Sequence, residues 1–235
     1  DELKRVLDEL VILVRVKLKF FQKGSRLADF FFLAHVIAAF WFGVAQVGTL
    51  LESVEGASLT WMGLWFAFVV INLGLTIGAS KKESDRVIKQ TVGTYFVWTV
   101  VIGISLFTLI WQGATWNQID VITAWITGLG VVCLVAYAFL KKISLSDPIV
   151  RGSMGLLFKL VPQLTLATNI FLYGGRGIAM YTILVGHLII TMRIGQIWMS
   201  ARRSSWDKHR IGVVVGEAGN EISWIVVTIV WFAVV

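Results

Sequence analysis

Seven apolar runs, each about twenty residues long, constrain the fold of this chain more than any other feature of its sequence. Inside a bilayer every backbone N–H and C=O must be paired within the protein, so only helices and closed barrels cross it. These runs are long enough to span as helices and do not alternate as barrel strands do. The sequence therefore predicts an all-α integral membrane protein with seven transmembrane helices, at residues 27–50, 59–79, 91–112, 120–140, 149–173, 178–199 and 212–235.

The composition agrees with this class of protein, because 57% of the residues are hydrophobic and only 15% are charged. A soluble domain could not cover so much apolar surface. The connections between the runs are short, which predicts one compact bundle without a separate soluble domain. Residues 1–23 mix leucine and valine with charged side chains at helical spacing. We expect them to form an amphipathic cytoplasmic lead-in, either lying on the membrane interface or solvated.

The basic residues are distributed unevenly along the chain, whose net charge is +7. Eighteen of the 21 lysines and arginines lie in the first 26 residues or in the second, fourth and sixth connections. The positive-inside rule then predicts a cytoplasmic N-terminus and an outside C-terminus, in an inner or plasma cell membrane. The charge is thus explained by the lipid bilayer and does not indicate a nucleic-acid partner. The three remaining cations are Lys159, Arg176 and Arg193.

The two halves of the chain share an ordered series of residues that indicates an internal duplication. Residues 93–101 align with residues 219–227 without a gap, through a glycine, a tryptophan and a Val-Val pair. A basic pair at 81–82 matches another at 202–203. A connector that crosses once gives both units the same orientation. The prediction is a 3+1+3 architecture, with a three-helix repeat at 27–112, a connector helix at 120–140 and a second three-helix repeat at 149–235.

Two motifs resemble the PQ-loop repeat, whose superfamily includes the SWEET-type sugar transporters. Pro162-Gln163 lies within the fifth run, and residues 53–58 (Ser-Val-Glu-Gly-Ala-Ser) precede the second. The first half has Ala45-Gln46 where the family has its proline-glutamine pair, and the charge pattern inverts the usual orientation. The resemblance is therefore to a distant, inverted member. It implies that the chain transports a sugar or a related small polar metabolite by alternating access.

Pro162 lacks a backbone N–H and leaves the carbonyl one turn earlier without its helical partner, which loosens the fifth span. The amides of Gln46 and Gln163 are expected to bond carbonyls freed in this way. These three residues form the predicted hinge.

The seventh run carries the densest set of polar side chains at membrane depth. Glu217, Asn220, Glu221 and Trp224 fall on one helical face at spacings of three, four and seven residues. This stripe predicts a polar binding site with a carboxylate that can take up a proton. For Glu217 the alternative is an interfacial ion pair with Lys208 or Arg210.

The aligned segment of the third run supplies a second set of candidate binding residues. It contains Thr94, Tyr95 and Trp98. The SWEET-type resemblance implies that Thr94 and Asn220 are a matched pair facing a central cavity, with aromatic side chains that close it. Asn72 in the second run is the remaining substrate-binding candidate, and its aligned residue is Arg193. We expect Arg193 to reach the cytoplasmic face or to pair with Glu217 or Glu221.

Two histidines lie within the predicted spans, His35 and His187. Each either relays a proton or makes a hydrogen bond between helices. Together with Glu217 and Glu221 they are the candidates for proton coupling.

The patterns expected of an enzyme are missing from the sequence. Neither a metal-ligand spacing nor a catalytic motif occurs, so we expect no metal, no cofactor and no enzymatic activity. Three functions were weighed: a facilitated or proton-coupled transporter of a small-molecule substrate, a PQ-loop-like membrane receptor that recognises a ligand or cargo without moving it, and a retinal photoreceptor. The photoreceptor is excluded because no lysine follows Lys208 to hold retinal. The sequence does not predict an oligomeric state.

Overall fold

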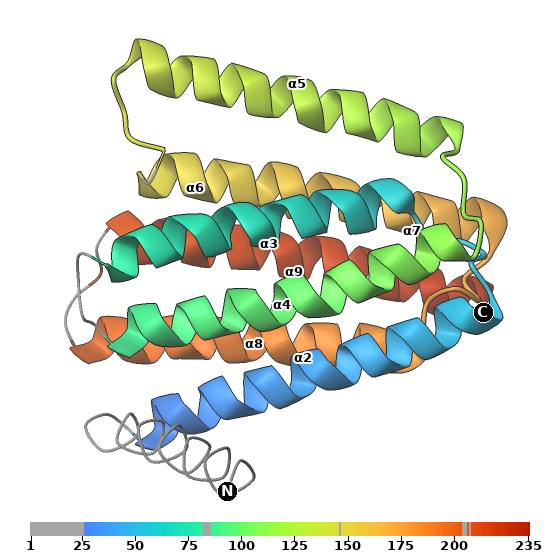
Figure 1. The fold of residues 1–235 in the computed structure, drawn as a ribbon, viewed down its shortest axis with the longest axis horizontal. Coiled ribbons are helices and arrows are strands. Elements are labelled where there is room, and N and C mark those ends of the chain that lie inside the picture. Colours follow the sequence, from blue (N-terminus) through green and yellow to red (C-terminus); the bar gives the residue numbers. More distant parts are fainter. Residues whose placement is uncertain (1–25, 82–85, 146, 204–205, 207) are drawn as a thin grey trace, which may run out of the picture.

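The structure is a computed structural model that describes residues 26–81, 86–145, 147–203, 206 and 208–235 (Figure 1). The expected amphipathic lead-in at residues 1–23 lies outside the described residues. The helices are α2 (Arg26–Glu52), α3 (Leu59–Ser80), α4 (Arg86–Trp111), α5 (Gln118–Leu140), α6 (Pro148–Gly155), η1 (Leu156–Leu160), α7 (Val161–Tyr173), α8 (Met180–Arg203) and α9 (Lys208–Val234).

Every described element is helical, and the prediction of seven transmembrane helices is confirmed in number and position. Seven helices are long and apolar enough to cross a membrane, so the chain is an integral membrane protein. The fifth span differs from a simple helix. It consists of α6, a π-helical turn η1 and α7, which follow one another without a break in the chain.

The helices pack in a definite order. Helix α4 packs against both α2 and α3, and α9 packs against α8 as well as against α6, η1 and α7. Contacts of α2 with α8, and of α3 with η1 and α7, join these two sets of helices into one bundle. Helix α5 runs along the outside of the bundle, beside α3 and α7 (Figure 1).

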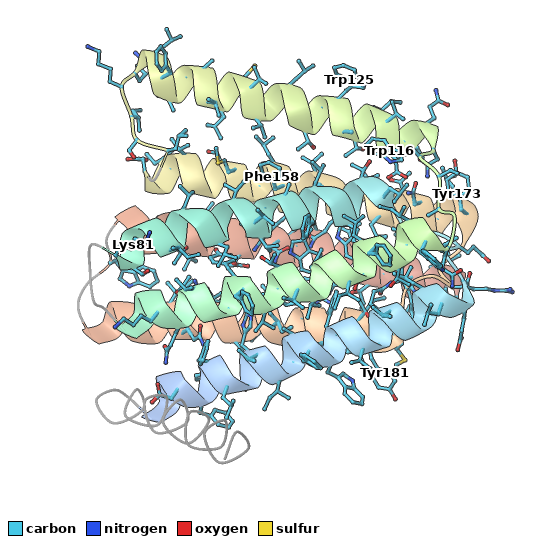
Figure 2. All side chains as sticks on the ribbon, in the orientation of Figure 1. Lys81, Trp116, Trp125, Phe158, Tyr173 and Tyr181 are labelled. Atoms are coloured by element: carbon cyan, nitrogen blue, oxygen red, sulfur yellow. The ribbon has the colours of Figure 1, made fainter. Side chains whose placement is uncertain are left out.

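The two ends of the bundle differ in charge. The connections α3–α4, α5–α6 and α8–α9 lie at one end, where Figure 2 shows Lys81. We call this the basic end, and we call the end with the other three connections the opposite end. Trp116 and Tyr173 lie near the opposite end and are exposed, which is typical of aromatic side chains at a membrane–water interface (Figure 2).

The share of buried residues distinguishes the fifth span, at the centre of the bundle, from α5 at its periphery. Half of the residues in the Gly152–Tyr173 span are buried, against 17% in the Gln118–Leu140 span. Trp125 projects from α5 away from the bundle (Figure 2) and is 69% exposed. Helix α5 therefore presents most of its surface to lipid, whereas the span with the π turn lies at the centre.

The α2–α3 and α7–α8 loops are joined at the opposite end. The Gly177 N–H donates to the Glu55 carbonyl at 2.8 Å, and the Gln46 side chain donates to the Gly177 carbonyl at 2.7 Å. Gly56 has a φ of +74°, and a Cβ there would lie 1.7 Å from the Gly174 carbonyl oxygen. Only glycine fits at this contact, so the two loops close together over this end.

Candidate functional site

A cavity of about 70 Å³ lies inside the bundle and is lined by α2, α3, α4, η1, α7, α8 and α9. Its volume is enough for several water molecules. Its lining combines charged, polar and aromatic side chains, which is the composition expected of a binding site for a small polar solute. The lining residues are His35, Phe42, Trp65, Phe68, Val69, Thr91, Thr94, Tyr95, Trp98, Lys159, Gln163, Gly186, Ile189, Ile190, Arg193, Glu217, Asn220 and Trp224.

An ion pair forms one side of the cavity. Lys159 Nζ lies 3.0 and 3.2 Å from the two carboxylate oxygens of Glu217, and each side chain is only 15% exposed. Lys159 Nζ also lies 5.0 Å from the centre of the Phe68 ring, within the range of a cation–π contact. Lys159 belongs to the π turn η1, and π turns often occur at functional sites.

A chain of hydrogen bonds extends from this ion pair to α7. The Asn220 amide donates to Glu217 Oε2 at 3.2 Å, and Gln163 Nε2 donates to Asn220 Oδ1 at 2.8 Å. The Ser223 hydroxyl contacts Gln163 Oε1. The amide groups of Asn220 and Gln163 are thereby fixed in orientation, and α7 is tied to α9. We call Lys159, Gln163, Glu217, Asn220 and Ser223 the cavity cluster.

Aromatic side chains form the wall of the cavity toward the opposite end. Trp65, Trp98 and Phe42 pack together with ring centroids 5.1 to 5.4 Å apart. Trp224 stacks on Trp61 at 6.1 Å. Trp61 and Trp65 lie in the first two turns of α3, which begins at the opposite end. The wall and the joined loops lie between the cavity and the opposite end.

Two indole nitrogens of the wall have hydrogen-bond acceptors. Trp98 Nε1 donates to His35 Nε2 at 2.9 Å, and Trp224 Nε1 donates to the Ile183 carbonyl at 2.9 Å. His35 is buried and its Nε2 is an acceptor, so this ring makes an interhelical hydrogen bond between α2 and α4. That is the second of the two roles expected for a membrane histidine.

Several predicted residues meet at this cavity. Thr94, Tyr95, Trp98, Asn220 and Trp224 all line it. Thr94 Oγ1 donates to the Gln90 carbonyl one turn earlier at 3.1 Å, and the Tyr95 ring packs edge-on against Phe68.

Three charged residues lie at the cavity: Lys159, Glu217 and Arg193. Glu217 pairs with Lys159, a partner that the sequence did not indicate. Arg193 lines the cavity and donates to Gln196 Oε1 at 3.3 Å, one turn nearer the basic end. That its side chain reaches the cytoplasmic face stays a prediction. Within the described residues it has no ion pair with Glu217 or Glu221.

Asn72 and Gln46 do not line the cavity. The Asn72 amide donates to the Phe68 carbonyl one turn earlier, and Gln46 is part of the loop contact with Gly177. Neither Gln46 nor Gln163 donates to a carbonyl freed within its own helix, so that expectation is wrong. The π turn η1 lies directly before Pro162, at the position where the sequence predicted a loosened helix. Its use as a hinge stays a prediction.

Glu221 lies outside the cavity lining and pairs with His187. Glu221 Oε1 lies 2.6 Å from His187 Nδ1, and His187 Nε2 lies 2.7 Å from Thr228 Oγ1. An α-helix turns by about 100° per residue, so Asn220 and Glu221 fall at the two edges of the stripe. One edge faces the cavity and α7, while the other faces α8. The stripe therefore does not face the cavity as a whole: Asn220 lines it, whereas Glu221 contacts His187 on α8.

The hydrogen bonds of the His187–Glu221 pair can be arranged in two ways without moving its heavy atoms. If the Thr228 hydroxyl donates to the Trp224 carbonyl, 2.8 Å away, it accepts from His187 Nε2, and one more proton lies between Nδ1 and Glu221. If it donates to Nε2 instead, Nδ1–H donates to an ionised Glu221. Both ring nitrogens of His187 have a hydrogen-bond partner in either arrangement.

A second polar cluster lies where α3 and α5 begin, and the sequence analysis did not find it. The Asp120 carboxylate is fully buried. Its Oδ1 accepts from the Ser58 hydroxyl at 2.5 Å and from the Thr60 N–H at 3.3 Å. Asn117 caps α5 through the Asp120 N–H and donates to Asn169 on α7. We call Ser58, Thr60, Asn117, Asp120 and Asn169 the Asp120 cluster.

Only one short sequence pattern points to the Asp120 cluster. Asn117 followed three residues later by Asp120 is a helix-start pattern, but the donors at the start of α3 lie about sixty residues earlier. Ser223 was also missed, although it lies three residues after Asn220 on the same helix face.

Comparisons with protein-family models, curated proteins and solved structures gave no match to this chain. Among the residues that the structure describes, no group of three or more His, Cys, Asp or Glu side chains is placed to hold a metal ion. The function must therefore be argued from the cavity itself.

Proposed function

We propose that this chain is a transporter that moves a small polar solute, a sugar or a related metabolite, across the membrane by alternating access. The observation that carries the proposal is the central cavity, which is lined by helices from both halves of the chain and combines fixed amides, charges and aromatic rings. Its aromatic wall and the joined α2–α3 and α7–α8 loops separate it from the opposite end. An arrangement closed on one side is what one state of an alternating-access cycle requires.

The packing order of the helices supports a transporter built from two parallel repeats. In α2–α4 the third helix packs against the other two, and in the set from α6 to α9 the last helix, α9, again packs against both others. Contacts between the sets are also paired, because the first element of each set meets the second helix of the other. We propose that the two sets move relative to each other about the Pro162 region, in a distant PQ-loop-like architecture.

The transporter is proposed to lie with the basic end in the cytoplasm, because eighteen of 21 basic residues fall at that end or in the first 26 residues. Single cysteines at Ser53 and at Ser144 test this orientation. An impermeant maleimide should label Ser53→Cys in intact cells and should label Ser144→Cys only after permeabilisation. The reverse pattern would overturn the orientation. Both labels are read in a Cys133→Ala background.

The transport proposal is tested with purified protein in two steps. A panel of sugars, carboxylates and amino acids is screened by thermal shift at two pH values, because a ligand that binds the folded state raises its melting temperature. The solute with the largest shift is then loaded into proteoliposomes, and its efflux is measured. We expect protein-dependent efflux that is saturable. If no solute shifts the melting temperature and none leaves the vesicles, the proposal is wrong.

Asn220 provides the variant for both steps. Its amide lies at the cavity and is held between Gln163 and Glu217. Asn220→Ala should weaken solute binding by about 1–3 kcal/mol, the cost of leaving buried polar partners unpaired. Thr168→Ala is the matched control, because the Thr168 side chain is exposed on α7 and bonds only to the Leu164 carbonyl. Equal binding by both variants would show that the solute binds elsewhere.

The alternative function is a membrane receptor that recognises a ligand or cargo without transporting it. Lys159 and Arg193 favour it, because two cations at the cavity suit a ligand that is held firmly. The two functions differ in the efflux step. Solute binding that depends on Asn220, together with vesicles that retain their contents, would identify the receptor.

A further inference from the structure

The charges that line the cavity do not balance. Lys159, Arg193 and Glu217 are the side chains of fixed charge in the lining, which gives two cations and one anion. Lys159 and Glu217 are paired at 3.0 Å. Arg193 has a neutral hydrogen-bond partner, Gln196, one turn further along α8. His35 adds no charge, because its Nε2 accepts from the Trp98 indole and the ring is therefore neutral.

The position of Arg193 makes this imbalance costly. Arg193 lies within the Met180–Trp198 span, and a guanidinium at membrane depth is unfavourable unless a negative charge or water compensates it. Glu217 lies within electrostatic reach of both cations, but its two carboxylate oxygens are already bonded to Lys159 and Asn220. Arg193 is therefore available for a charge that a solute brings.

We infer that the solute of this cavity is a small monocarboxylate, bound through its carboxylate to Arg193, with its apolar body against the aromatic wall. This inference rests on the proposed function and names its substrate class. A guanidinium presents two parallel N–H donors that match a carboxylate. The wall of Phe42, Trp65, Trp98 and Trp224 offers ring faces to a small apolar or hydroxylated body. The cavity volume of about 70 Å³ has room for a small body of this kind.

The same geometry disfavours two neighbouring classes of solute. A neutral polyol would leave the Arg193 charge uncompensated. A zwitterionic amino acid would bring an ammonium group, and the one carboxylate of the cavity, Glu217, already has Lys159 as its cationic partner.

Three probes of nearly equal size test the inference: lactate, propane-1,2-diol and alanine. The diol replaces the carboxylate of lactate by a hydroxymethyl group, and alanine replaces its hydroxyl by an ammonium group. Melting temperatures of the purified full chain are measured against each probe, with sodium chloride at equal ionic strength as the salt control. We expect a saturable rise with lactate, a smaller one with alanine, and none with the diol or with chloride.

Variants of the arginine locate the effect. Arg193→Gln should bind lactate about 10- to 100-fold more weakly, the effect of losing a charge-assisted hydrogen bond to the ligand. Arg193→Lys keeps the positive charge but lacks the planar guanidinium, so it should bind lactate with an intermediate affinity. This variant also keeps the inference testable if Arg193→Gln fails to fold. Arg176→Gln is the matched control, because Arg176 is exposed at the opposite end and lies 3.9 Å from Glu55.

The outcomes separate the inference from the proposed function. If lactate gives no shift, or if Arg193→Gln binds lactate as tightly as the parent, the monocarboxylate inference is wrong. If the diol binds as well as lactate and proteoliposomes release it, the chain transports a neutral solute, and the transporter proposal stands without the inference. If lactate binds through Arg193 and vesicles retain it, the inference holds and the receptor alternative replaces transport.

Discussion

The Asp120 cluster and the cavity cluster are both buried polar networks, but they compensate charge in different ways. The Asp120 carboxylate is fully buried and accepts from a hydroxyl and from a backbone N–H at the start of α3, and it also lies in the first turn of α5. Glu217 instead faces a lysine and an amide at the edge of a cavity. One carboxylate is held by helix N-termini, and the other by side chains that can move.

This difference indicates different roles. Partial positive charge at a helix N-terminus is fixed in the backbone and stabilises an anion without further ordering. The hydrogen bonds of the Asp120 cluster tie α3, α5 and α7 together, so this cluster suits a structural role. Side-chain charges beside a cavity can exchange partners when a solute enters. The cavity cluster is therefore the one placed to couple binding to a change in structure.

Removing the lysine of the cavity cluster should have the largest effect on stability. Lys159→Met leaves Glu217 buried beside a cavity with only Asn220 as a partner. Breaking a buried ion pair from one side costs about 3–5 kcal/mol. We expect a loss of that size in the free energy of unfolding, measured by reversible denaturation in detergent.

The double variant Lys159→Met/Glu217→Gln is the test of the cause. It removes the unpaired charge and should recover most of the lost stability. Lys141→Met, at the exposed end of α5, should have little effect. If the double variant is no more stable than Lys159→Met, the damage comes from lost packing and the comparison of charges fails.

Removing the carboxylate of the Asp120 cluster should have a somewhat smaller effect. Asp120→Ala leaves the Ser58 hydroxyl and the Thr60 N–H without their shared acceptor, at a cost of about 2–4 kcal/mol. Asp147→Ala, which removes the exposed cap of α6, should cost about 1 kcal/mol. Solute binding by Asp120→Ala should equal that of the parent when both are folded. A loss of binding without a loss of stability would place Asp120 in the functional site.

The fold was predictable from the sequence because hydropathy and the positive charges act locally. All seven spans were located to within a few residues, except that α4 and α9 begin several residues earlier on their basic sides. The irregular turn between α6 and α7 was predictable only from Pro162. Pro162 indicates where the helix is irregular, but it does not indicate that the irregular turn is π-helical or that Lys159 on this turn meets Glu217 on α9.

The candidate site was predictable in part for the same reason. Asn220 and Trp224 share a helix face with Glu217, and that face lines the cavity. The partners were not predictable, because each lies far away in the sequence: Lys159 for Glu217, Gln163 for Asn220, and His187 for Glu221. The spacing along a helix predicts which side chains share a face, but the contacts of each side chain depend on which helix packs against that face.

The smallest effect on stability, and the sharpest on pH dependence, is expected at the His187–Glu221 pair. Glu221→Gln keeps a hydrogen-bond partner for His187 Nδ1 and removes the proton shared between the carboxylate and the ring, so the free energy of unfolding should change by less than about 1 kcal/mol. If transport is coupled to this proton, efflux or binding of the solute should lose its pH dependence between about pH 5 and 8. His187→Gln should have the same effect, and the double variant should add nothing, because each single variant already breaks the same 2.6 Å carboxylate–imidazole contact. Glu52→Gln, an exposed carboxyl on α2, is the control. If Glu221→Gln has the pH profile of the parent, Glu221 does not couple a proton to transport. Proton coupling would then be assigned to the cavity cluster, on the side of α9 that carries Asn220.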